Sequence, residues 1–450
     1  MNTTLLMEAV DRHTAEILAA LEYIWQHPQT GFNEWLADAY LAERFESAGY
    51  ALTRAGNIPG FIADLDTGRP GPCVLVMGEL DSLICADHPD ADTSTKAVHA
   101  CGHCAQAAAL LGLALALREP GVMDGMSGRI RLCAVPAEEL IELEQRDKLR
   151  RDGIISHPSG KIEFLRRGLF NGCNIALLVH TSAIRKAFEV TRGGNGCVLK
   201  RIEYTGRAAH AGGAPHRGIN ALYAATLGIQ AVNALRETFR DADHIRYHPI
   251  ITSGGDAVNA IPARVTLESY VRGASLDAIR AANARVNRAL AASAAALGAQ
   301  VHISDIPGYA PLNNDPELCE IAAQAARAVS GDNDVAINNN WSTGCTDMGD
   351  LSLVMATVQP YAGGASGTGH GADYTISNPI AACIRPAQMQ LAMLAMLLED
   401  GAARAQAVVD AARPRLMSID EYFESMRRFE LERDMVHYES DGSVTLRLED

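Results

Sequence analysis

The hydrophobic pattern of the first part of the chain predicts a regular alternation of strands and helices. Continuous apolar runs at 73–77, 129–135 and 175–179 are typical of strands that are buried on both faces of a sheet. Apolar residues recur at helical spacing at 8–24, 32–48 and 105–118. This alternation predicts an α/β fold with a mostly parallel sheet.

The pattern changes at about residue 188. Strands are expected within 189–206 and at 248–253, 263–272 and 300–306, with helices at 218–238 and 276–297. This β-α-β-β-α-β order predicts a ferredoxin-like module with its own small sheet.

The α/β pattern resumes after this module, which is therefore expected to be an insertion. Helices are expected at 316–330, 386–399 and 419–435, and strands at 354–358 and 444–448. The expected domains are a first part of the α/β domain at 1–187, the inserted domain at 188–308, a second part of the α/β domain at 309–401 and a C-terminal extension at 402–450.

Composition narrows the class of protein. The net charge of −15 over 450 residues argues against a nucleic-acid partner. No apolar run is long enough to span a membrane, and the first residues do not resemble a secretory signal. The ten cysteines form no disulfide framework, which is typical of a reduced compartment. We therefore expect a cytoplasmic protein without a membrane or nucleic-acid partner.

Candidate metal ligands begin with the sequence HACGHC at 99–104. Cys101 and His103 supply a thiolate and an imidazole, which are good ligands for zinc, and Gly102 lets the two side chains converge. Alone, this triplet is weak evidence, because a loop before a helix is the simpler interpretation. Further donors strengthen the metal interpretation, because Asp81, Glu138, Glu139 and His180 follow the three predicted strands. The carboxyl ends of parallel strands are where sites form in such sheets.

Each donor also has a simpler interpretation. Glu138 and Glu139 could be solvated charges, His180 a satisfied buried histidine, His370 a residue of a flexible glycine-rich loop, and Asp81 the cap of a turn. In the functional interpretation, one glutamate binds metal and the other is a general base, while Asp81 orients a ligating histidine. The five ligands Cys101, His103, Glu139, His180 and His370 are too many for one closed site and too few for two. They fit two metal ions with open positions for water and substrate.

The chain resembles the aminoacylase-type dinuclear metallohydrolases, and within them the branch of aminobenzoyl-glutamate hydrolase and the indoleacetyl-amino-acid hydrolases. The resemblance spans roughly residues 25–399. It is carried by these motifs: Glu79-Leu80-Asp81-Ser82-Leu83, His99 to Cys104, Pro136 to Glu139, His180, Gly369-His370, Ala209-His210-Ala211 and Asn259-Ala260-Ile261-Pro262.

The resemblance implies that the five ligands bind two divalent ions, manganese or zinc, with cobalt or nickel as further options. It implies that Glu138 moves the proton of the attacking water and that Asp81 orients a ligating histidine. The inserted module would be a lid that also forms a homodimer. His210 and Asn259 of the lid would contact a small-molecule substrate, with His210 polarising the attacked centre. Arg272, at the end of a lid strand, could hold a substrate carboxylate or be a surface charge.

The chain departs from the usual pattern of this branch near the metal ligands. Cys104 replaces an aspartate, Glu79 replaces another, and Gln106 stands at a position that is commonly polar or histidine. The charged segment at 140–158 is an additional feature, expected as a solvated surface helix or as a wall of the site entrance.

These features favour a metal-dependent amidohydrolase that cleaves the C–N amide bond of a small N-acyl or N-aroyl amino acid. Two alternatives remain open at this point. The same machinery could remove an amine from an aromatic ring, as in 5-nitroanthranilate aminohydrolase. The protein could also be a metal-free binding protein without catalytic activity.

Overall fold

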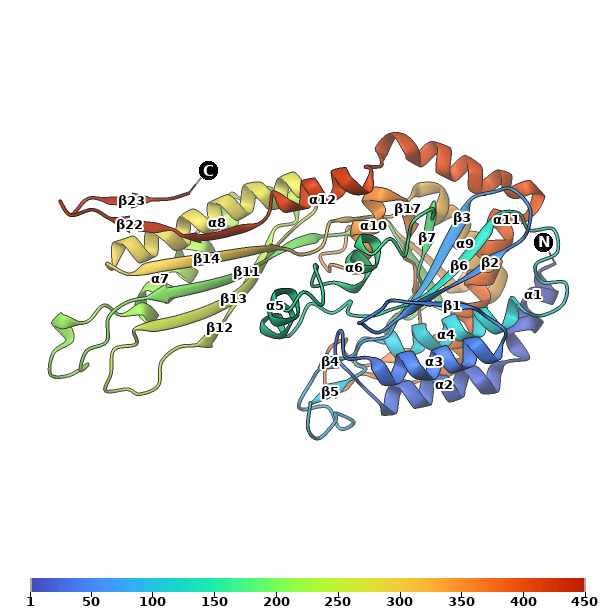
Figure 1. The fold of residues 1–450 in the computed structure, drawn as a ribbon, viewed down its shortest axis with the longest axis horizontal. Coiled ribbons are helices and arrows are strands. Elements are labelled where there is room, and N and C mark those ends of the chain that lie inside the picture. The colour runs from blue at the N-terminus through green and yellow to red at the C-terminus, as the bar shows by residue number, and fades with distance from the viewer. Residues whose placement is uncertain (1, 449–450) are drawn as a thin grey trace. The chain divides into compact units, whose positions relative to one another are not determined.

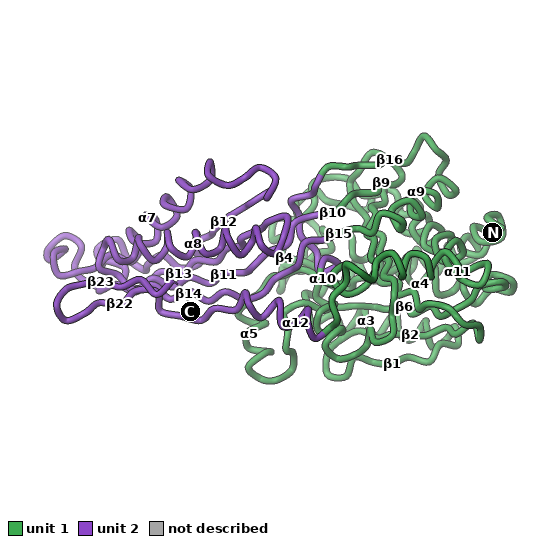
Figure 2. The backbone as a smooth tube through the Cα atoms, turned by 90° about the horizontal axis from the view of Figure 1, so that it is seen from above, with its two compact units in different colours: residues 1–193, 313–340, 350–419 green, residues 194–312, 341–349, 420–450 purple. Residues whose placement is uncertain are grey.

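The structure is a computed structural model that describes residues 2–448 (Figure 1). The chain divides into two compact units, which Figure 2 distinguishes by colour. Unit 1 holds residues 1–193, 313–340 and 350–419, and unit 2 holds residues 194–312, 341–349 and 420–450. The segment at 194–312 is therefore inserted between parts of unit 1, and the tail is shared between the two units.

Unit 1 is built around a six-stranded, mostly parallel sheet, as the apolar runs predict. The strand order is β1 (Leu52–Arg54), β2 (Phe61–Asp66), β6 (Arg129–Val135), β3 (Cys73–Glu79), β7 (Ile175–Leu177) and β17 (Ala356–Val358). Strand β3 pairs in parallel with both β6 and β7, and every residue of β3 is buried. The carboxyl ends of these three strands therefore lie at one edge of the sheet.

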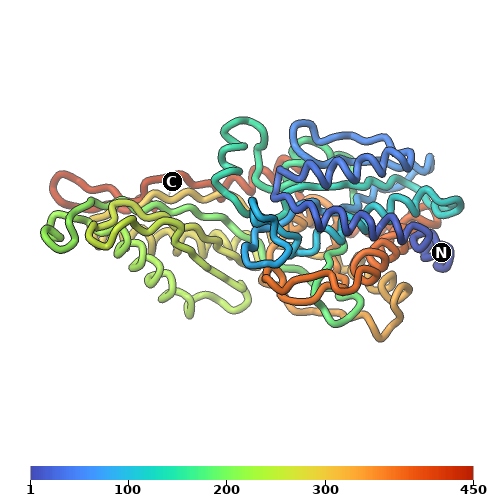
Figure 3. Tube along the Cα trace, turned by 90° about the horizontal axis from the view of Figure 1, so that it is seen from below, coloured from blue at the N-terminus to red at the C-terminus, as the bar shows by residue number. Residues whose placement is uncertain are grey.

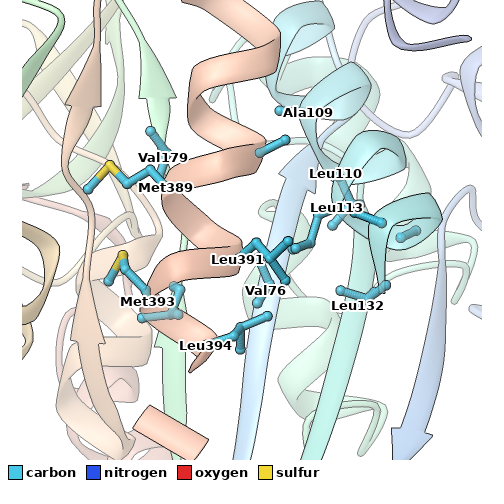
Figure 4. Packing of buried hydrophobic residues seen from close by; sticks show 14 of the residues in the cluster. Val76, Ala109, Leu110, Leu113, Leu132, Val179, Met389, Leu391, Met393 and Leu394 are labelled. Atoms are coloured by element: carbon cyan, nitrogen blue, oxygen red, sulfur yellow. The ribbon is translucent and has the colours of Figure 1, made fainter. Parts of the chain in front are cut away.

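Helix α4 (His103–Ala116) packs directly on β3. All of its residues except Leu115 are buried, which explains its Ala- and Leu-rich sequence. A Cβ at Gly78 would lie 3.0 Å from the carbonyl oxygen of Gln106, so glycine permits the close approach of helix and strand. Figure 4 shows Leu110 and Leu113 of α4 and Leu391 of α11 (Arg385–Ala412) around Val76 of β3.

The amino-terminal segment forms two helices, whereas the pattern predicts one helix at 8–24. Helix α1 (Thr3–Asp11) ends at Asp11, and α2 (Thr14–Gln26) begins after His13. Gln388 of α11 donates a hydrogen bond to Asp11 Oδ1 over 2.9 Å. Figure 3 shows the blue amino-terminal helices beside the orange α11, in agreement with this bond.

Helix α11 follows a π-helical turn at Ile380–Ile384 and breaks at 399–402, where the backbone leaves the helical conformation. Contrary to the expectation from the sequence, the helical stretch Ile380–Arg427, which includes α11, is long and apolar enough to span a membrane by length and composition, but 83% of its most apolar window is buried inside the protein. The apolar residues of this helix therefore belong to the protein core.

The remaining elements of unit 1 are short or peripheral to the sheet. They are α3 (Trp35–Ser47), β4 (Leu83–Ile84), β5 (Ala97–Val98), α5 (Leu143–Arg151), α6 (Gly160–Arg166), β8 (His180–Thr181), β9 (Phe188–Thr191), α9 (Pro316–Ser330), β16 (Val335–Asn338), α10 (Met348–Val354), β18 (Tyr361–Ala362), β19 (Ala365–Ser366) and β20 (Thr375–Ile376). The short strands β10 (Gly193–Gly194) and β15 (Leu312–Asn313) pair where the chain passes between units.

Unit 2 contains the predicted β-α-β-β-α-β module. Its elements are β11 (Gly196–Thr205), α7 (Ala221–Asn233), β12 (Arg246–Ser253), β13 (Arg264–Gly273), α8 (Leu276–Ala296) and β14 (Gln300–Pro307). All pairs in the order β12-β13-β11-β14 are antiparallel. Alternate residues of β13 and β14 are buried, as expected for a sheet with one face covered by helices.

The tail differs from the prediction. The helix expected at 419–435 ends early, as α12 (Ile419–Arg427), and the chain continues as β21 (Leu431–Asp434), β22 (Val436–Tyr438) and β23 (Val444–Leu446). Strand β21 pairs with β14 and adds a fifth strand to the sheet of unit 2. Half-buried and exposed residues alternate along β21, because pairing with β14 determines the local conformation.

The packing between α4 and the sheet gives a direct stability prediction. Leu110→Ala leaves a cavity at a fully buried position, and we expect a loss of about 2–5 kcal/mol in the free energy of unfolding. The exposed Leu36 supplies the control, since Leu36→Ala should change stability by less than about 1 kcal/mol. Equilibrium unfolding in urea measures both, and equal effects would contradict the described packing.

Candidate metal centre

Predicted donors of unit 1 gather at the carboxyl edge of its sheet, together with Glu79, which was not predicted as a donor. Glu79 ends β3 and Asp81 follows it, Glu138 and Glu139 follow β6, and His180 follows β7. Because β3 lies between β6 and β7, the chain segments that leave these strands begin as neighbours. Position in the sheet therefore explains why residues about a hundred positions apart converge.

The HACGHC segment contributes its ligands from a tight turn at the start of α4. Gly102 has a φ of +97° and directly precedes the helix. A Cβ at this position would lie 2.6 Å from Tyr374 Oη and 3.0 Å from the carbonyl oxygen of Thr181. Glycine is therefore required for both conformation and space between Cys101 and His103.

Asp81 holds two of the predicted ligands. Its Oδ1 atom lies 3.0 Å from His103 Nδ1, and its Oδ2 atom accepts a hydrogen bond of 2.8 Å from the backbone N–H of Glu139. Burial acts to raise the pKa of Asp81, but the charge and hydrogen bond of His103 outweigh it and lower this pKa to about 2. The contact with Nδ1 leaves His103 Nε2 to face the centre of the site.

Two further histidines complete the arrangement. His180 Nδ1 lies 2.8 Å from the carbonyl oxygen of Thr181, while its Nε2 atom is 3.6 Å from Cys101 Sγ. His370 Nε2 lies 3.1 Å from Glu139 Oε1. The backbone N–H of His370 donates a 2.8 Å hydrogen bond to the carbonyl of Ala100, which links the loop of His370 to the HACGHC turn.

Three groups of donor atoms in unit 1 are close enough to hold a metal ion, each with atoms within 4.8 Å of one another. They are Cys101 with His103 and His180, Cys101 with Glu139 and His370, and His103 with Glu138 and Glu139. The first two groups share only Cys101. All five predicted ligands therefore converge, in two sets that meet at one thiol.

Buried polar atoms that lack hydrogen bonds indicate whether these residues suit a metal ion. His103 Nε2 and Glu79 Oε2 are both buried and form no hydrogen bond among the described residues, although they lie only 3.1 Å apart. A buried polar atom without a partner costs stability, so such atoms usually have a specific reason to be present. A soft thiolate, imidazoles and carboxylates facing one another are a donor set that suits a divalent transition metal.

Two buried cations near these anions could not be predicted from the sequence. Lys161 of α6 is fully buried and its Nζ donates to Glu79 Oε1 over 2.5 Å. Arg146 of α5 is 2% exposed and donates to the carbonyl oxygens of Glu139 and Pro158. The segment at 140–158 does form a helix, but the expectation that it is only a solvated surface helix is wrong for Arg146.

A cleft of about 360 Å³ opens beside these ligands. It is lined by Cys101, His180, Thr181, Ser182, Ala183, Gly369, His370 and Tyr374. His370 has a φ of +63°, an unusual value for a residue other than glycine, and its side chain is 58% exposed. Such backbone strain is typical of functional sites. A small molecule in this cleft would contact the candidate ligands directly.

The three remaining predicted site residues lie in unit 2. His210 and Asn259 are close together, since His210 bridges to Ala260 and the carbonyl of Asn259 accepts from the N–H of Ala211. Both side chains are exposed. Arg272 is half-buried, with its guanidinium 5.3 Å from the ring of Tyr270 and beside the thiol of Cys345. These contacts place Arg272 within the packing of unit 2 and do not make it a freely solvated surface charge.

Known proteins share this sequence and fold. The model of peptidase family M20/M25/M40 matches residues 75–395. One of the p-aminobenzoyl-glutamate hydrolase subunits of Escherichia coli is 30% identical over 274 residues, which cover 59% of this chain and 52% of that protein. Indole-3-acetyl-aspartic acid hydrolase of Enterobacter agglomerans is 27% identical over 346 residues, 74% of each chain. The chain thus spans about half the length of the first relative and three quarters of the second.

A solved structure supports the fold. The YXEP protein of Bacillus subtilis, described as a dinuclear metal binding peptidase of the M20 family, superposes with a TM-score of 0.63 at 18% identity. The superposition covers 86% of this chain and 99% of that protein. The resemblance predicted from the motifs is confirmed: the chain belongs to peptidase family M20/M25/M40 and is a metal-dependent hydrolase.

Proposed function

We propose that this protein hydrolyses the C–N amide bond of a small N-acyl or N-aroyl amino acid at a centre of two divalent metal ions. The ions would be held by Cys101, His103, Glu139, His180 and His370. Manganese and zinc both suit this set, with cobalt or nickel as further options. Glu138 is the proposed general base, and Asp81 the residue that orients His103.

One observation carries this proposal. Cys101 is common to two separate sets of ligand atoms, one with His103 and His180 and the other with Glu139 and His370. A thiolate can lie between two cations, so a shared cysteine supports a dinuclear centre over two independent sites. Asp81 contacts one residue of each set, which supports the same conclusion.

The remaining groups provide the proton transfers that amide hydrolysis needs. Two bound divalent ions would supply Lewis acidity at the carbonyl and lower the pKa of the attacking water. Glu138 is 8% exposed, and its Oε2 atom lies 4.0 Å from His103 Nε2, at the side of the ligands. Its carboxylate can accept a proton from water and donate it to the leaving nitrogen, which would otherwise leave as an unstable amide anion.

The two named relatives support the substrate class. Their names describe the cleavage of an aroyl–glutamate and of an indoleacetyl–aspartate, both amides between an aromatic acid and an acidic amino acid. In our proposal the lid residues His210 and Asn259 contact such a substrate, and His210 polarises the attacked carbonyl. Arg272 is a candidate partner of the substrate carboxylate.

We also propose that unit 2 forms a homodimer. Strand β12 is the outer strand of its sheet, and Ile250 and Ile251 on it are 52% and 41% exposed. Tyr223 and Leu227, one turn apart on α7, are also exposed. An outer strand with exposed isoleucines and a helix with exposed apolar residues both favour association with a second copy.

Metal content and product analysis test the main proposal. Protein purified in chelator-free buffer should carry or take up two metal equivalents, and should release a free amino acid and a carboxylic acid from p-aminobenzoyl-glutamate or a related N-acyl amino acid. Release of ammonia and a phenol from an aromatic amine would instead establish the aminohydrolase alternative. Absence of both metal binding and turnover after manganese loading would establish a non-catalytic binding protein.

The role of Glu138 gives a mutational prediction. Glu138→Ala should lower kcat by about 10²–10⁴-fold, because the general base is lost, while both metal equivalents remain bound. Glu144→Ala, an exposed glutamate of α5, serves as the control and should leave kcat unchanged. Steady-state kinetics with metal analysis measures this, and full activity of the Glu138 variant would exclude it as the base.

The conformation of Gly102 gives a second prediction. Gly102→Ala should weaken metal binding by at least about tenfold, because its Cβ would displace Tyr374 or the backbone of Thr181 and move Cys101 from His103. Gly68 also has a positive φ, but its Cβ would meet nothing within 4 Å, so Gly68→Ala isolates the backbone strain. Competition with a chelator measures both affinities, and a similar small change in both variants would refute the spatial argument.

The proposed dimer gives a third prediction. Ile250→Asp should raise the dimer dissociation constant at least about tenfold, because it places a charge on the apolar outer strand. Val444→Asp, at a similarly exposed position of β23, should have no effect on assembly. Sedimentation of both variants tests the interface, and a wild-type protein that sediments as a monomer would contradict the proposed dimer.

A further inference from the structure

A third buried carboxylate lies in the candidate metal centre and has no role in the function proposed above. Glu79 is the last residue of β3 and is fully buried. Its two oxygen atoms have different surroundings. Oε1 accepts a hydrogen bond from Lys161 Nζ over 2.5 Å, whereas Oε2 forms no hydrogen bond among the described residues. One oxygen is therefore held by a cation, and the other is available for a second partner.

The second oxygen is directed at a predicted metal ligand. Glu79 Oε2 lies 3.1 Å from His103 Nε2. The Nδ1 atom of His103 is already engaged by Asp81, so Nε2 is the nitrogen that can bind an ion. Glu79 and His103 therefore each present one atom without a hydrogen bond to the same small region.

Through His103, this region adjoins the first ligand set. His103 belongs with Cys101 and His180, whose Sγ and Nε2 atoms are 3.6 Å apart. A set of one thiolate and two imidazoles leaves at least one coordination position open on a four-coordinate ion.

We propose that Glu79 is a further metal ligand, binding through Oε2 the ion held by Cys101, His103 and His180, with Lys161 as the residue that positions it. This inference rests on the metal centre proposed above and adds a ligand from this chain's own departure from the usual aspartate. The carboxylate then bridges a metal ion and an ammonium group, which satisfies both oxygens.

Charge explains why a lysine is needed. Each fully buried carboxylate carries a desolvation cost, and Glu79 lies close to the carboxylate of Glu138. Lys161 balances one negative charge without occupying the oxygen that faces the ion. Lys161 lies on α6, which follows the additional charged helix α5, whereas Glu79 ends β3. The proposed ligand and its counter-ion therefore lie in different parts of the sequence.

Metal binding by matched variants tests the proposal without relying on turnover. The variants are Glu79→Gln, Lys161→Met and the double variant Glu79→Gln/Lys161→Met. The double variant removes both buried charges together, so that neither is left uncompensated. The control is Lys200→Met in unit 2, because Lys200 is also fully buried and is paired with Asp305. Each protein is titrated with Co²⁺ alone, and its absorption spectrum and chelator-competition affinity are recorded.

In the expected result, the wild-type protein binds two Co²⁺ ions. Glu79→Gln and the double variant should lose affinity for one ion by about 10–100-fold and show altered ligand-field bands, with the thiolate-to-cobalt band retained. Lys161→Met should retain two ions, with the affinity of one lowered, and Lys200→Met should match wild type. Circular dichroism of the metal-free proteins verifies folding, and the double variant substitutes for Glu79→Gln if the single variant does not fold.

Two results would overturn the inference in distinguishable ways. If wild type binds two ions and the double variant binds them with unchanged affinity and spectrum, Glu79 is not a ligand and the dinuclear centre still stands. If wild type binds no Co²⁺, the proposed centre itself fails and the inference fails with it.

Discussion

The candidate site depends on the two contacts that the carboxylate of Asp81 makes. This carboxylate holds His103 through one oxygen and the backbone of Glu139 through the other, and it is fully buried. These two partners come from the start of α4 and from the segment after β6. One side chain thereby fixes two elements that are close in the fold but distant in sequence. A buried carboxylate is stable only when such partners are present. This requirement keeps Asp81 in contact with His103 and with the backbone of Glu139.

The second constraint is the balance of charge in a buried region. Carboxylates at positions 79, 81, 138 and 139 lie at the ends of two neighbouring strands, and little solvent reaches them. Lys161 and Arg146 place two buried cations among them, both from helices after β6. A metal centre adds positive charge to the same region. The chain therefore combines permanent cations with the ions that it is proposed to bind.

Much of the fold follows from the sequence pattern because burial dominates its local structure. The strands β3 and β6 and the module of unit 2 were predictable from apolar runs and from period-two alternation. The break at Arg12–His13 was not, since both sides continue the helical periodicity. Strand β21 was not either, because its conformation comes from pairing with β14, a tertiary contact that leaves no local signal.

The candidate site could be predicted only as far as strand ends and motifs identify donors. Asp81, Glu138, Glu139 and His180 stand at strand ends, and Cys101 and His103 form a recognisable motif. Lys161 gives no such signal, because a lysine in an amphipathic helix is normally solvated. Its burial depends on the carboxylate of Glu79, a residue 82 positions earlier in the chain. Pairs of this kind become visible only in three dimensions.

The sheet of unit 2 has a consequence for how the protein is made. Its fifth strand, β21, lies at Leu431–Asp434, more than a hundred residues after β14, with which it pairs. During synthesis the first four strands leave the ribosome early. The outer edge of β14 stays unpaired until β21 and thus nearly the whole chain has left the ribosome. The nascent protein therefore carries an uncovered sheet edge through much of its translation. A truncation before residue 431 would leave that edge open permanently.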